Sequence, residues 1–284
     1  MKMKFFAILG GDVRNVYLYS LLKKQGQPVL YTGLHHPLLS EKDECSLDGV
    51  LDTATHLITG IPFTKDDATL YGPSASTQIP LKALLSGMHS GHTIYGGLFS
   101  KESTLQFQEK NISYLDFMQM ESVAKQNSVA TAEGAIYTAM NASPLTIWGN
   151  HCFVLGFGKC GTTLSDRLRG LCAKVHVFAR NSVERAEAMV RGYNAFPLDA
   201  LEEHLGEGVF IFNTIPSSFL PAKLLAYTPK ESVLIDIASA PGCLIPDETV
   251  PSERRVICCP GLPARIAPLT SAQILLNCIL DGNE

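Results

Sequence analysis

The sequence has no apolar run approaching the ~18 residues that a membrane-spanning helix requires. It also has no basic excess, because 23 lysines and arginines stand against 27 aspartates and glutamates, for a formal net charge of −4. Nucleic acids and anionic membrane surfaces attract proteins with the opposite balance. We therefore expect a cytoplasmic protein with neither a membrane nor a nucleic-acid partner, in which a few local arginines can still bind small anions.

Paired cysteine motifs and repeats are missing too. The eight cysteines contain no CxxC spacing, and several lie in apolar, strand-like segments, as is typical of buried, reduced thiols. We therefore expect no metal site and no disulfide framework. The absence of internal repeats and of low-complexity segments excludes a solenoid and a disordered chain.

The chain does have enough apolar sequence for large cores, and its strand and helix signals alternate regularly. Hydrophobic residues make up 46% of the 284 residues, and this length exceeds the ~100–200 residues of one typical domain. Alternating strands and helices indicate an α/β fold with mainly parallel sheets. We expect two Rossmann-like domains joined by helical connectors around a cleft.

The first domain is expected over residues 1–117. Its start, MKMKFFAIL, is too short for the apolar core of a signal peptide and leads into Gly-Gly-Asp, so it is interpreted as a strand. The pattern predicts strands over 4–9, 28–32, 56–59, 93–96 and 111–114, and helices over 13–25, 78–86 and 101–109. Residues 34–54 show no pattern that assigns them.

The rest of the chain is expected to form a connector, a second domain and a returning helix. The connector covers 118–150, with a helical signal over 118–141 that is interrupted around 127–130. The second domain covers 151–264, with strands predicted over 152–155, 174–179, 210–214, 233–237 and 255–259. A final helix over 267–280, within the segment 265–284, is expected to return toward the first domain.

A G-x-G-x-x-G motif follows the predicted strand 152–155 and opens a helix. Gly156 permits a tight turn, Gly158 lets the backbone approach a pyrophosphate, and Gly161 allows the helix to pack closely on the strand. The helix N-terminus adds N–H donors and the positive end of a dipole. This strand–turn–helix context predicts dinucleotide binding by the whole loop, including Phe157, Lys159 and Cys160.

The end of the next strand distinguishes NADP from NAD. An NAD site usually has an acidic residue there to accept hydrogen bonds from the ribose, whereas this strand ends in Arg180, Asn181 and Ser182, with no carboxylate before Glu184. Arg180 can pair with a 2′-phosphate, and the two residues after it can donate hydrogen bonds. The alternative is that Arg180 is a solvated residue at a strand end. We predict NADP as the cofactor.

Three later strand ends are expected to border the same cofactor, because ligands of open α/β sheets bind beyond the carboxyl ends of the strands. All three are rich in small residues, prolines and hydroxyls, although ordinary turns favour the same composition. The cofactor-binding candidates in them are Thr214, Ile215, Pro216, Ala238, Ser239 and Pro260.

Together these motifs resemble the family formed by the A subunit of dipicolinate synthase. The resemblance is carried by GGDVR (10–14), TAEGA (131–135), GFGKCG (156–161), NTIPS (213–217), IDIASAPG (235–242) and PGLPARIAP (260–268). Matching segments run in order from residue 5 to about residue 280. The C-terminal segments are more specific than the glycine motif, and weaker similarity extends to alanine dehydrogenase and transhydrogenase.

The resemblance implies oxidation of a dihydrodipicolinate-level intermediate of the lysine pathway to dipicolinate, for the spores of bacteria. It also implies a partner, the flavoprotein-like B subunit of dipicolinate synthase, and enzymes of this two-domain kind commonly assemble as homo-oligomers. Residues 34–54 and 66–92 match none of these motifs, so the substrate side of the first domain is left unassigned.

A dicarboxylate substrate requires cationic partners, and Arg14 and Arg265 are the candidates. Arg14 follows the first strand–helix turn and Arg265 follows the last strand, so both are expected to face the cleft between the domains. The alternatives are an exposed residue in the first turn of a helix for Arg14 and a hinge salt bridge for Arg265.

Asp12 and Glu133 are the acidic candidates for the catalytic site. Asp12 either accepts a proton or caps the helix that follows it. Glu133 either lies near the cleft or favours the dipole of a helix expected to begin near Thr131. Further hydroxyls that can bind substrate oxygens are those of Thr131, Ser217 and Ser239.

None of the eight histidines has a sequence context typical of a catalytic base, which argues against a 2-hydroxyacid dehydrogenase. Two other functions remain open. One is an NADP-dependent imine or amino-acid dehydrogenase of the alanine dehydrogenase type. The other is a non-catalytic regulatory protein that binds a dinucleotide.

Overall fold

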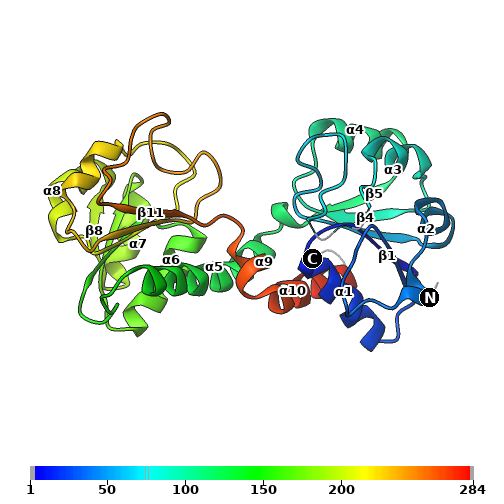
Figure 1. Ribbon diagram of the computed structural model, residues 1–284, viewed down its shortest axis with the longest axis horizontal. Coiled ribbons are helices and arrows are strands. Elements are labelled where there is room, and N and C mark those ends of the chain that lie inside the picture. Colours follow the sequence, from blue (N-terminus) through cyan, green and yellow to red (C-terminus); the bar gives the residue numbers. More distant parts are fainter. Residues whose placement is uncertain (1–3, 74, 76, 282–284) are drawn as a thin grey trace. The chain divides into compact units, whose positions relative to one another are not determined.

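The computed structural model describes residues 4–73, 75 and 77–281. The chain forms two compact units, the first comprising 1–124 together with 267–284 and the second comprising 125–266 (Figure 1). Each unit is built on its own parallel sheet, so the expected α/β fold with two parallel sheets is confirmed. No helix in the described part of the chain is long and apolar enough to cross a membrane.

The sheet of unit 1 has the strand order β2-β1-β3-β4-β5, and every neighbouring pair is parallel. In this order the chain turns back between β1 and β3, which is where such sheets bind ligands. The strand β1 is a run of four fully buried apolar residues, as expected of a central parallel strand covered on both faces. The strands are β1 (Phe6–Leu9), β2 (Val29–Thr32), β3 (His56–Thr59), β4 (Thr93–Gly96) and β5 (Ser113–Asp116).

Helices cover both faces of this sheet. One core contains α1 and α10, where Leu18 and Leu22 of α1 pack in the same cluster as Leu275 and Leu276 of α10. The other core joins the opposite face of the sheet to the shorter helices. The helices of unit 1 are α1 (Val13–Lys24), α2 (Leu47–Thr53), α3 (Leu81–Gly87), α4 (Lys101–Glu109) and α10 (Pro268–Asp281).

The sheet of unit 2 has the order β11-β10-β9-β6-β7-β8, again with all neighbours parallel. This is the order of dinucleotide-binding sheets, with the reversal between β6 and β9. Its strands are β6 (His151–Leu155), β7 (Lys174–Ala179), β8 (Asn194–Pro197), β9 (Phe210–Asn213), β10 (Val233–Asp236) and β11 (Arg255–Cys258).

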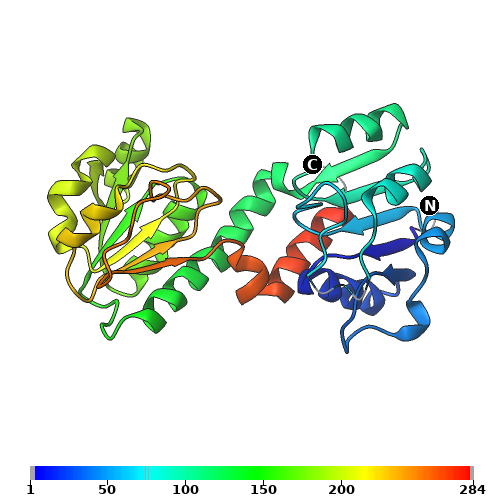
Figure 2. The ribbon, with the colours of Figure 1, turned by 45° about the horizontal axis from the view of Figure 1, so that its top comes forward.

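Both faces of this second sheet are buried under helices (Figure 2). Along β6, Cys152 and Val154 belong to one core, and Phe153 and Leu155 belong to the core on the other face. This alternation follows from the two-residue period of a strand. The helices are α5 (Glu121–Ala142), which begins in unit 1, α6 (Lys159–Gly170), α7 (Ser182–Val190), α8 (Leu201–His204) and α9 (Leu262–Ile266).

The expected interruption of the connector helix around residues 127–130 is wrong, because α5 is continuous. The polar residues that suggested a break hydrogen-bond inside the helix or to its neighbour. Ser128 Oγ donates to Lys125 O and contacts Thr163 Oγ1 of α6 at 2.7 Å. Thr131 Oγ1 donates to Asn127 O. Hydroxyls that bond the preceding turn are compatible with a helix interior.

Two other local differences have simple causes. The strand expected over 111–114 lies at 113–116, because Asn111 has φ +54° and ends the preceding turn in the left-handed region. Within residues 34–54, which no pattern assigned, α2 begins after Ser46, whose side chain accepts the Gly49 N–H. Only Val50 and Leu51 of α2 are buried, which is too little apolar sequence to show a helical period.

Candidate functional site

The glycine loop between β6 and α6 contains two glycines that the protein itself requires. Gly156 has φ +92°, and a Cβ there would lie 2.6 Å from Thr214 Oγ1. A Cβ on Gly161 would lie 2.2 Å from Gly156 O, closer than real side chains come to a backbone oxygen. Both positions therefore exclude any side chain for reasons of backbone and packing alone.

Gly158 is different, because nothing in the protein requires a glycine there. It is the N-cap of α6 with φ −73°, a conformation open to all residues, and apart from its two chain neighbours no atom lies within 4 Å of the position that its Cβ would occupy. The empty space lies in front of a helix N-terminus, where the first N–H groups have no partner inside the helix. A phosphate placed there would approach the backbone closely only if residue 158 has no side chain.

A cavity of about 630 Å³ lies at this end of the sheet. Its volume falls within the ~300–1,000 Å³ of small-molecule and cofactor sites. The ends of β6, β7 and β9 contribute to it, as expected for the reversal point of the strand order. The lining residues are Gly156, Phe157, Gly158, Lys159, Cys160, Arg180, Asn181, Glu184, Thr214, Ile215 and Pro216.

At the end of β7, Arg180 lines the cavity, and Arg185 fixes the backbone at this position. Arg180 is exposed, while the guanidinium of Arg185 donates to the carbonyls of Ala179 and Arg180 at 2.9 and 2.7 Å. Asn181 Oδ1 accepts the Val183 N–H and caps α7, so this oxygen already has a structural role. The exposed Ser182 is the first residue of α7.

Glu184, in the first turn of α7, also lines the cavity. The sequence identified it only as the first carboxylate after the strand. Its place follows from helix geometry, because the start of α7 lies directly at the end of β7. The lining therefore carries two cations, Lys159 and Arg180, and one anion.

The ends of β9 and β10 are joined by a buried amide–carboxylate pair. Asn213 Nδ2 donates to Asp236 Oδ1 at 2.8 Å, and Asn213 Oδ1 accepts the Ile215 N–H. The Asp236 carboxylate also accepts the N–H groups of Ala238 and Cys243, at 3.1 and 2.7 Å. One pair of side chains thus determines the paths of two loops.

Of the remaining cofactor candidates, none belongs to the described lining of the cavity. Ala238 is half-buried beside Asp236, and Ser239 and Pro260 are exposed. The lining thus includes the expected residues 156–160, 180–181 and 214–216. Gly161 and Ser182, which were also expected at the cofactor, lie outside the described lining together with these three.

In unit 1 the structure places Asp12 and Arg14 against each other. Asp12 caps α1 by accepting the Arg14 N–H, and the Arg14 guanidinium donates to both carboxylate oxygens, with a shortest distance of 2.7 Å. Arg14 Nη2 also donates to Ile61 O. Both residues are buried, so the carboxylate is held by the cap and the ion pair together.

A smaller cavity of about 230 Å³ lies near this pair and includes Tyr71 and Lys65. The Gly11 N–H donates to Tyr71 O at 2.8 Å, which ties the loop after β1 to the cavity wall. Burial raises the pKa of the Tyr71 phenol, Asp12 raises it further and Arg14 lowers it. This cavity lies within the segment 66–92 that no motif assigned, apart from Lys65.

The expectation that Glu133 lies in the first turn of a helix is wrong, since α5 begins twelve residues earlier at Glu121. Glu133 instead pairs with Arg167 of α6 at 3.8 Å, with both side chains about half-exposed. Thr131 hydrogen-bonds within α5. Arg265 is exposed on the short helix α9.

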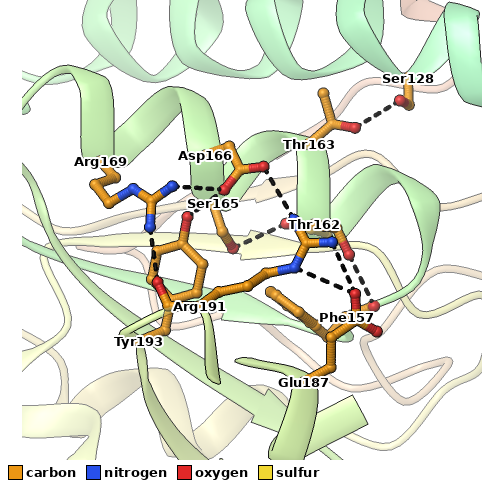
Figure 3. A network of polar contacts seen from close by, with 11 residues as sticks. Ser128, Phe157, Thr162, Thr163, Ser165, Asp166, Arg169, Glu187, Arg191 and Tyr193 are labelled. Carbon is orange, nitrogen blue, oxygen red and sulfur yellow. Dashed lines mark hydrogen bonds and ion pairs between the residues drawn. The ribbon is translucent and has the colours of Figure 1, made fainter. Parts of the chain in front are cut away.

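A polar network joins α6 to the end of α7 and to Tyr193, next to the glycine loop (Figure 3). Asp166 accepts the Tyr193 hydroxyl at 2.5 Å and also contacts Arg169 and Arg191. Burial and the bond to Asp166 raise the pKa of the Tyr193 phenol. The Tyr193 ring packs against Phe157 of the glycine loop, with the centroids 5.9 Å apart.

Removing the Tyr193 hydroxyl is expected to destabilise unit 2. Tyr193→Phe keeps the ring contacts and deletes one hydrogen bond to a charged acceptor, so the free energy of unfolding should fall by about 1 kcal/mol. Urea unfolding followed by circular dichroism measures this. Tyr137→Phe, at an exposed position of α5, is the matched control, and an equal effect of both changes would contradict the role of the network.

The sequence did not reveal the partners that fix the site residues. Asn213 and Asp236 lie in the motifs NTIPS (213–217) and IDIASAPG (235–242). Their pairing, however, depends on β9 and β10 being neighbours in the sheet. Tyr193 and Asp166 are separated by 27 residues and meet only after α6 and α7 have packed. A buried asparagine and a buried aspartate at the ends of apolar strands were the only available signals.

The first domain and the whole chain are both similar to the A subunit of dipicolinate synthase. Residues 5–118 match the family described as the N-terminal domain of the dipicolinate synthase A subunit. Over 276 residues the chain is 26% identical to the A subunit of dipicolinate synthase from Bacillus subtilis (strain 168), an alignment that covers 95% of this chain and 93% of the relative.

Solved structures show the same fold. The A chain of dipicolinate synthase from Bacillus subtilis superposes with a TM-score of 0.85 at 25% identity, over 98% of this chain and 95% of that chain. An L-alanine dehydrogenase superposes with a TM-score of 0.62 at 14% identity, over 97% of this chain and 88% of that chain. The second likeness concerns the fold alone.

Proposed function

We propose that the chain, which resembles the A subunit of dipicolinate synthase along nearly its whole length, is an NADP-linked oxidoreductase that forms dipicolinate. The substrate would be a dihydrodipicolinate-level intermediate of the lysine pathway. The observation that carries the cofactor part of this proposal is the cavity beside Gly158, with Arg180 on its wall.

The described residues fit a dinucleotide. The space at Gly158 is open, and the helix behind it presents its N-terminus, so a pyrophosphate can be held by backbone N–H groups. Arg180 lines the cavity at the end of β7, which supports its proposed role of donating to a 2′-phosphate. When bound, the oxidised nicotinamide supplies a hydride acceptor.

The chemistry demands little acid–base catalysis from the protein. Conversion of a dihydropyridine to a pyridine removes one hydride and one proton, and aromatisation drives the reaction. The protein therefore mainly has to orient the ring and exclude water. This agrees with a sequence in which no histidine has the context of a catalytic base.

The substrate carboxylates call for cations, and Arg14 and Arg265 are the proposed partners. Arg14 is pre-oriented, because Asp12 and Ile61 O hold its Nε and Nη2 groups. Asp12 then acts as a positioning residue rather than as the proton acceptor. Arg265 is exposed and can move to meet a ligand.

We further propose that the protein works with the flavoprotein-like B subunit of dipicolinate synthase and forms a homo-oligomer in the cytoplasm of a sporulating cell. The Bacillus subtilis relative is named as an A subunit, which supports the existence of a partner. The amount of dipicolinate formed by the chain alone, compared with the amount formed together with the B subunit, tests whether the partner is required.

The deciding experiment supplies enzymatically generated dihydrodipicolinate and NADP⁺ and follows NADPH and pyridine-dicarboxylate absorbance together. Appearance of both products in equal amounts supports the oxidoreductase. If NADP binds but neither product forms, with or without the B subunit, the chain is a non-catalytic dinucleotide-binding protein. If NADPH appears with an amino acid and not with the dihydropyridine, the alanine dehydrogenase type of activity holds instead.

Replacing Arg265 by methionine tests its role in substrate binding. Arg265→Met should raise the KM for the dihydropyridine at least about tenfold, since one charge-assisted hydrogen bond is lost. The Kd for NADP should remain unchanged. Steady-state kinetics and calorimetry measure the two quantities, and an unchanged KM would remove Arg265 from the site. The same change at Arg14 is less informative, because it leaves the buried Asp12 without its partner.

A further inference from the structure

The guanidinium of Arg180 contacts the segment 217–220, which follows β9. Its Cζ lies 5.5 Å from the centroid of the Phe219 ring, and its Nη2 lies 3.4 Å from Ser217 Oγ. Arg180 follows β7 and the segment follows β9, so the contact reaches across the end of β6, which lies between them in the sheet. The glycine loop begins at that same end.

This segment is anchored to the core through its backbone. The N–H groups of Phe219 and Leu220 both donate to Cys243 O, at 2.8 and 2.9 Å. Cys243 in turn donates its N–H to the buried carboxylate of Asp236. Leu220 is buried and pairs with Leu244 in an isolated bridge. The backbone of Phe219 is therefore fixed by bonds that do not involve Arg180, and its ring packs against the core on this face of the sheet.

We propose that Phe219 and Ser217 are positioning residues that determine the preference for a 2′-phosphorylated dinucleotide by holding the Arg180 guanidinium. The inference rests on the proposed NADP function and names residues that neither the glycine motif nor the strand-end arginine identifies. A guanidinium on the face of an aromatic ring keeps its N–H donors pointing outward in the plane of the group. Ser217 accepts from one donor, and in the described residues the others make no protein hydrogen bond.

The physical reason is the entropy of an exposed arginine. A free arginine side chain loses much rotamer freedom when it binds a phosphate, and this loss weakens binding. A side chain held near the required position before the ligand arrives loses less. Without the ring, Arg180 would keep its charge and reach, but would bind the 2′-phosphate less tightly.

The test compares ligands with and without the 2′-phosphate. Calorimetry gives the Kd of the full chain for NADP, NAD, adenosine 2′,5′-bisphosphate and 5′-AMP. In Phe219→Leu, the Kd for the two 2′-phosphorylated ligands should rise about three- to tenfold, while the Kd for NAD and 5′-AMP stays within about twofold. Phe219→Tyr should restore the wild-type ratio, because it keeps the aromatic face. Ser217→Ala should produce a smaller change in the same direction.

A matched control is Phe196→Leu, which changes another partly buried phenylalanine of the same core cluster. It should leave all four affinities unchanged. Equal weakening of NADP and NAD in Phe219→Leu, or no weakening of either, would overturn the positioning role. If wild-type protein prefers NADP and only Arg180 variants lose this preference, the inference fails and the proposed function stands. If wild-type protein shows no preference for NADP, the cofactor proposal itself fails.

Discussion

Arg180→Asp is expected to weaken NADP binding by about 30- to 100-fold or more, because it deletes charge-assisted hydrogen bonds to a phosphate and adds a repelling carboxylate. NAD has no 2′-phosphate, so its Kd should change much less. A carboxylate at this position can even accept hydrogen bonds from the ribose, as in NAD sites. The measurement is the Kd for each dinucleotide by calorimetry.

The charge-matched control is Lys230→Asp. Lys230 lies just before β10, at the amino ends of the strands, whereas the cavity lies at their carboxyl ends. Both variants change the net charge by the same amount, so a general electrostatic effect on anionic ligands would appear in both. Equal losses of NADP and NAD affinity in Arg180→Asp would show that Arg180 does not bind the 2′-phosphate.

Gly158→Ala is expected to abolish most binding of both dinucleotides without disturbing the fold. Apart from the two neighbouring residues of the chain, the added methyl group meets no protein atom within 4 Å, and the backbone at φ −73° accepts alanine. The methyl group instead occupies the space in front of the α6 N-terminus. A clash or displacement there should weaken NADP and NAD alike, by about 10- to 100-fold.

Gly170→Ala is the control for this variant. Gly170 ends the same helix, also has open space at its Cβ position, and lies at the far end from the loop. Gly170→Ala should unfold at the wild-type urea concentration or above it, since alanine favours a helix over glycine. Gly158→Ala lies at the N-cap, where alanine is less favourable than glycine, so it should lose no more than about 1 kcal/mol of stability and remain folded. A Gly158→Ala protein that binds NADP normally would show that the pyrophosphate does not lie over this residue.

Most strands of the two buried sheets were predictable from the sequence, but β8 (Asn194–Pro197), which has no fully buried residue, was not. The strands at 56–59, 93–96 and 174–179 have the limits that were predicted. A strand covered on both faces of a parallel sheet consists of a short apolar run, so the polar residues that flank the run mark where the strand begins and ends. The limits of β5 and the presence of α2 were not predictable. The turn at Asn111 determines where β5 begins, and the Ser46 cap determines where α2 begins. Neither a turn residue nor a cap leaves a periodic signal in the sequence.

The connector illustrates how a local composition can mislead. A cluster of asparagine, serine and threonine predicts a break when side chains compete for backbone groups. In α5 the hydroxyls of Ser128 and Thr131 instead bond the preceding turn, and Thr163 of α6 supplies an external partner. The error about the start of the helix changed the environment predicted for Glu133.

The residues around the glycine loop were identified from the sequence, but the contacts that hold them were not. Residues 156–160 and the end of β7 share a motif and a known spacing. The contact of Ser217 and Phe219 with Arg180 joins chain positions 37 and 39 residues apart, and it exists only because β6 lies between the two strands concerned. Sheet order is a tertiary property that no short motif contains.

The division of unit 1 into two chain segments affects how the protein is made. Residues 125–266 are contiguous, so the second unit has its complete sequence available before α10 has been synthesised. The first unit must wait for the last helix, because Leu275, Leu276 and Ile279 complete the core that also contains Leu18 and Leu22 of α1. During synthesis the first unit is therefore the later one to finish, and its uncovered apolar face is the part of the nascent chain most in need of protection from aggregation.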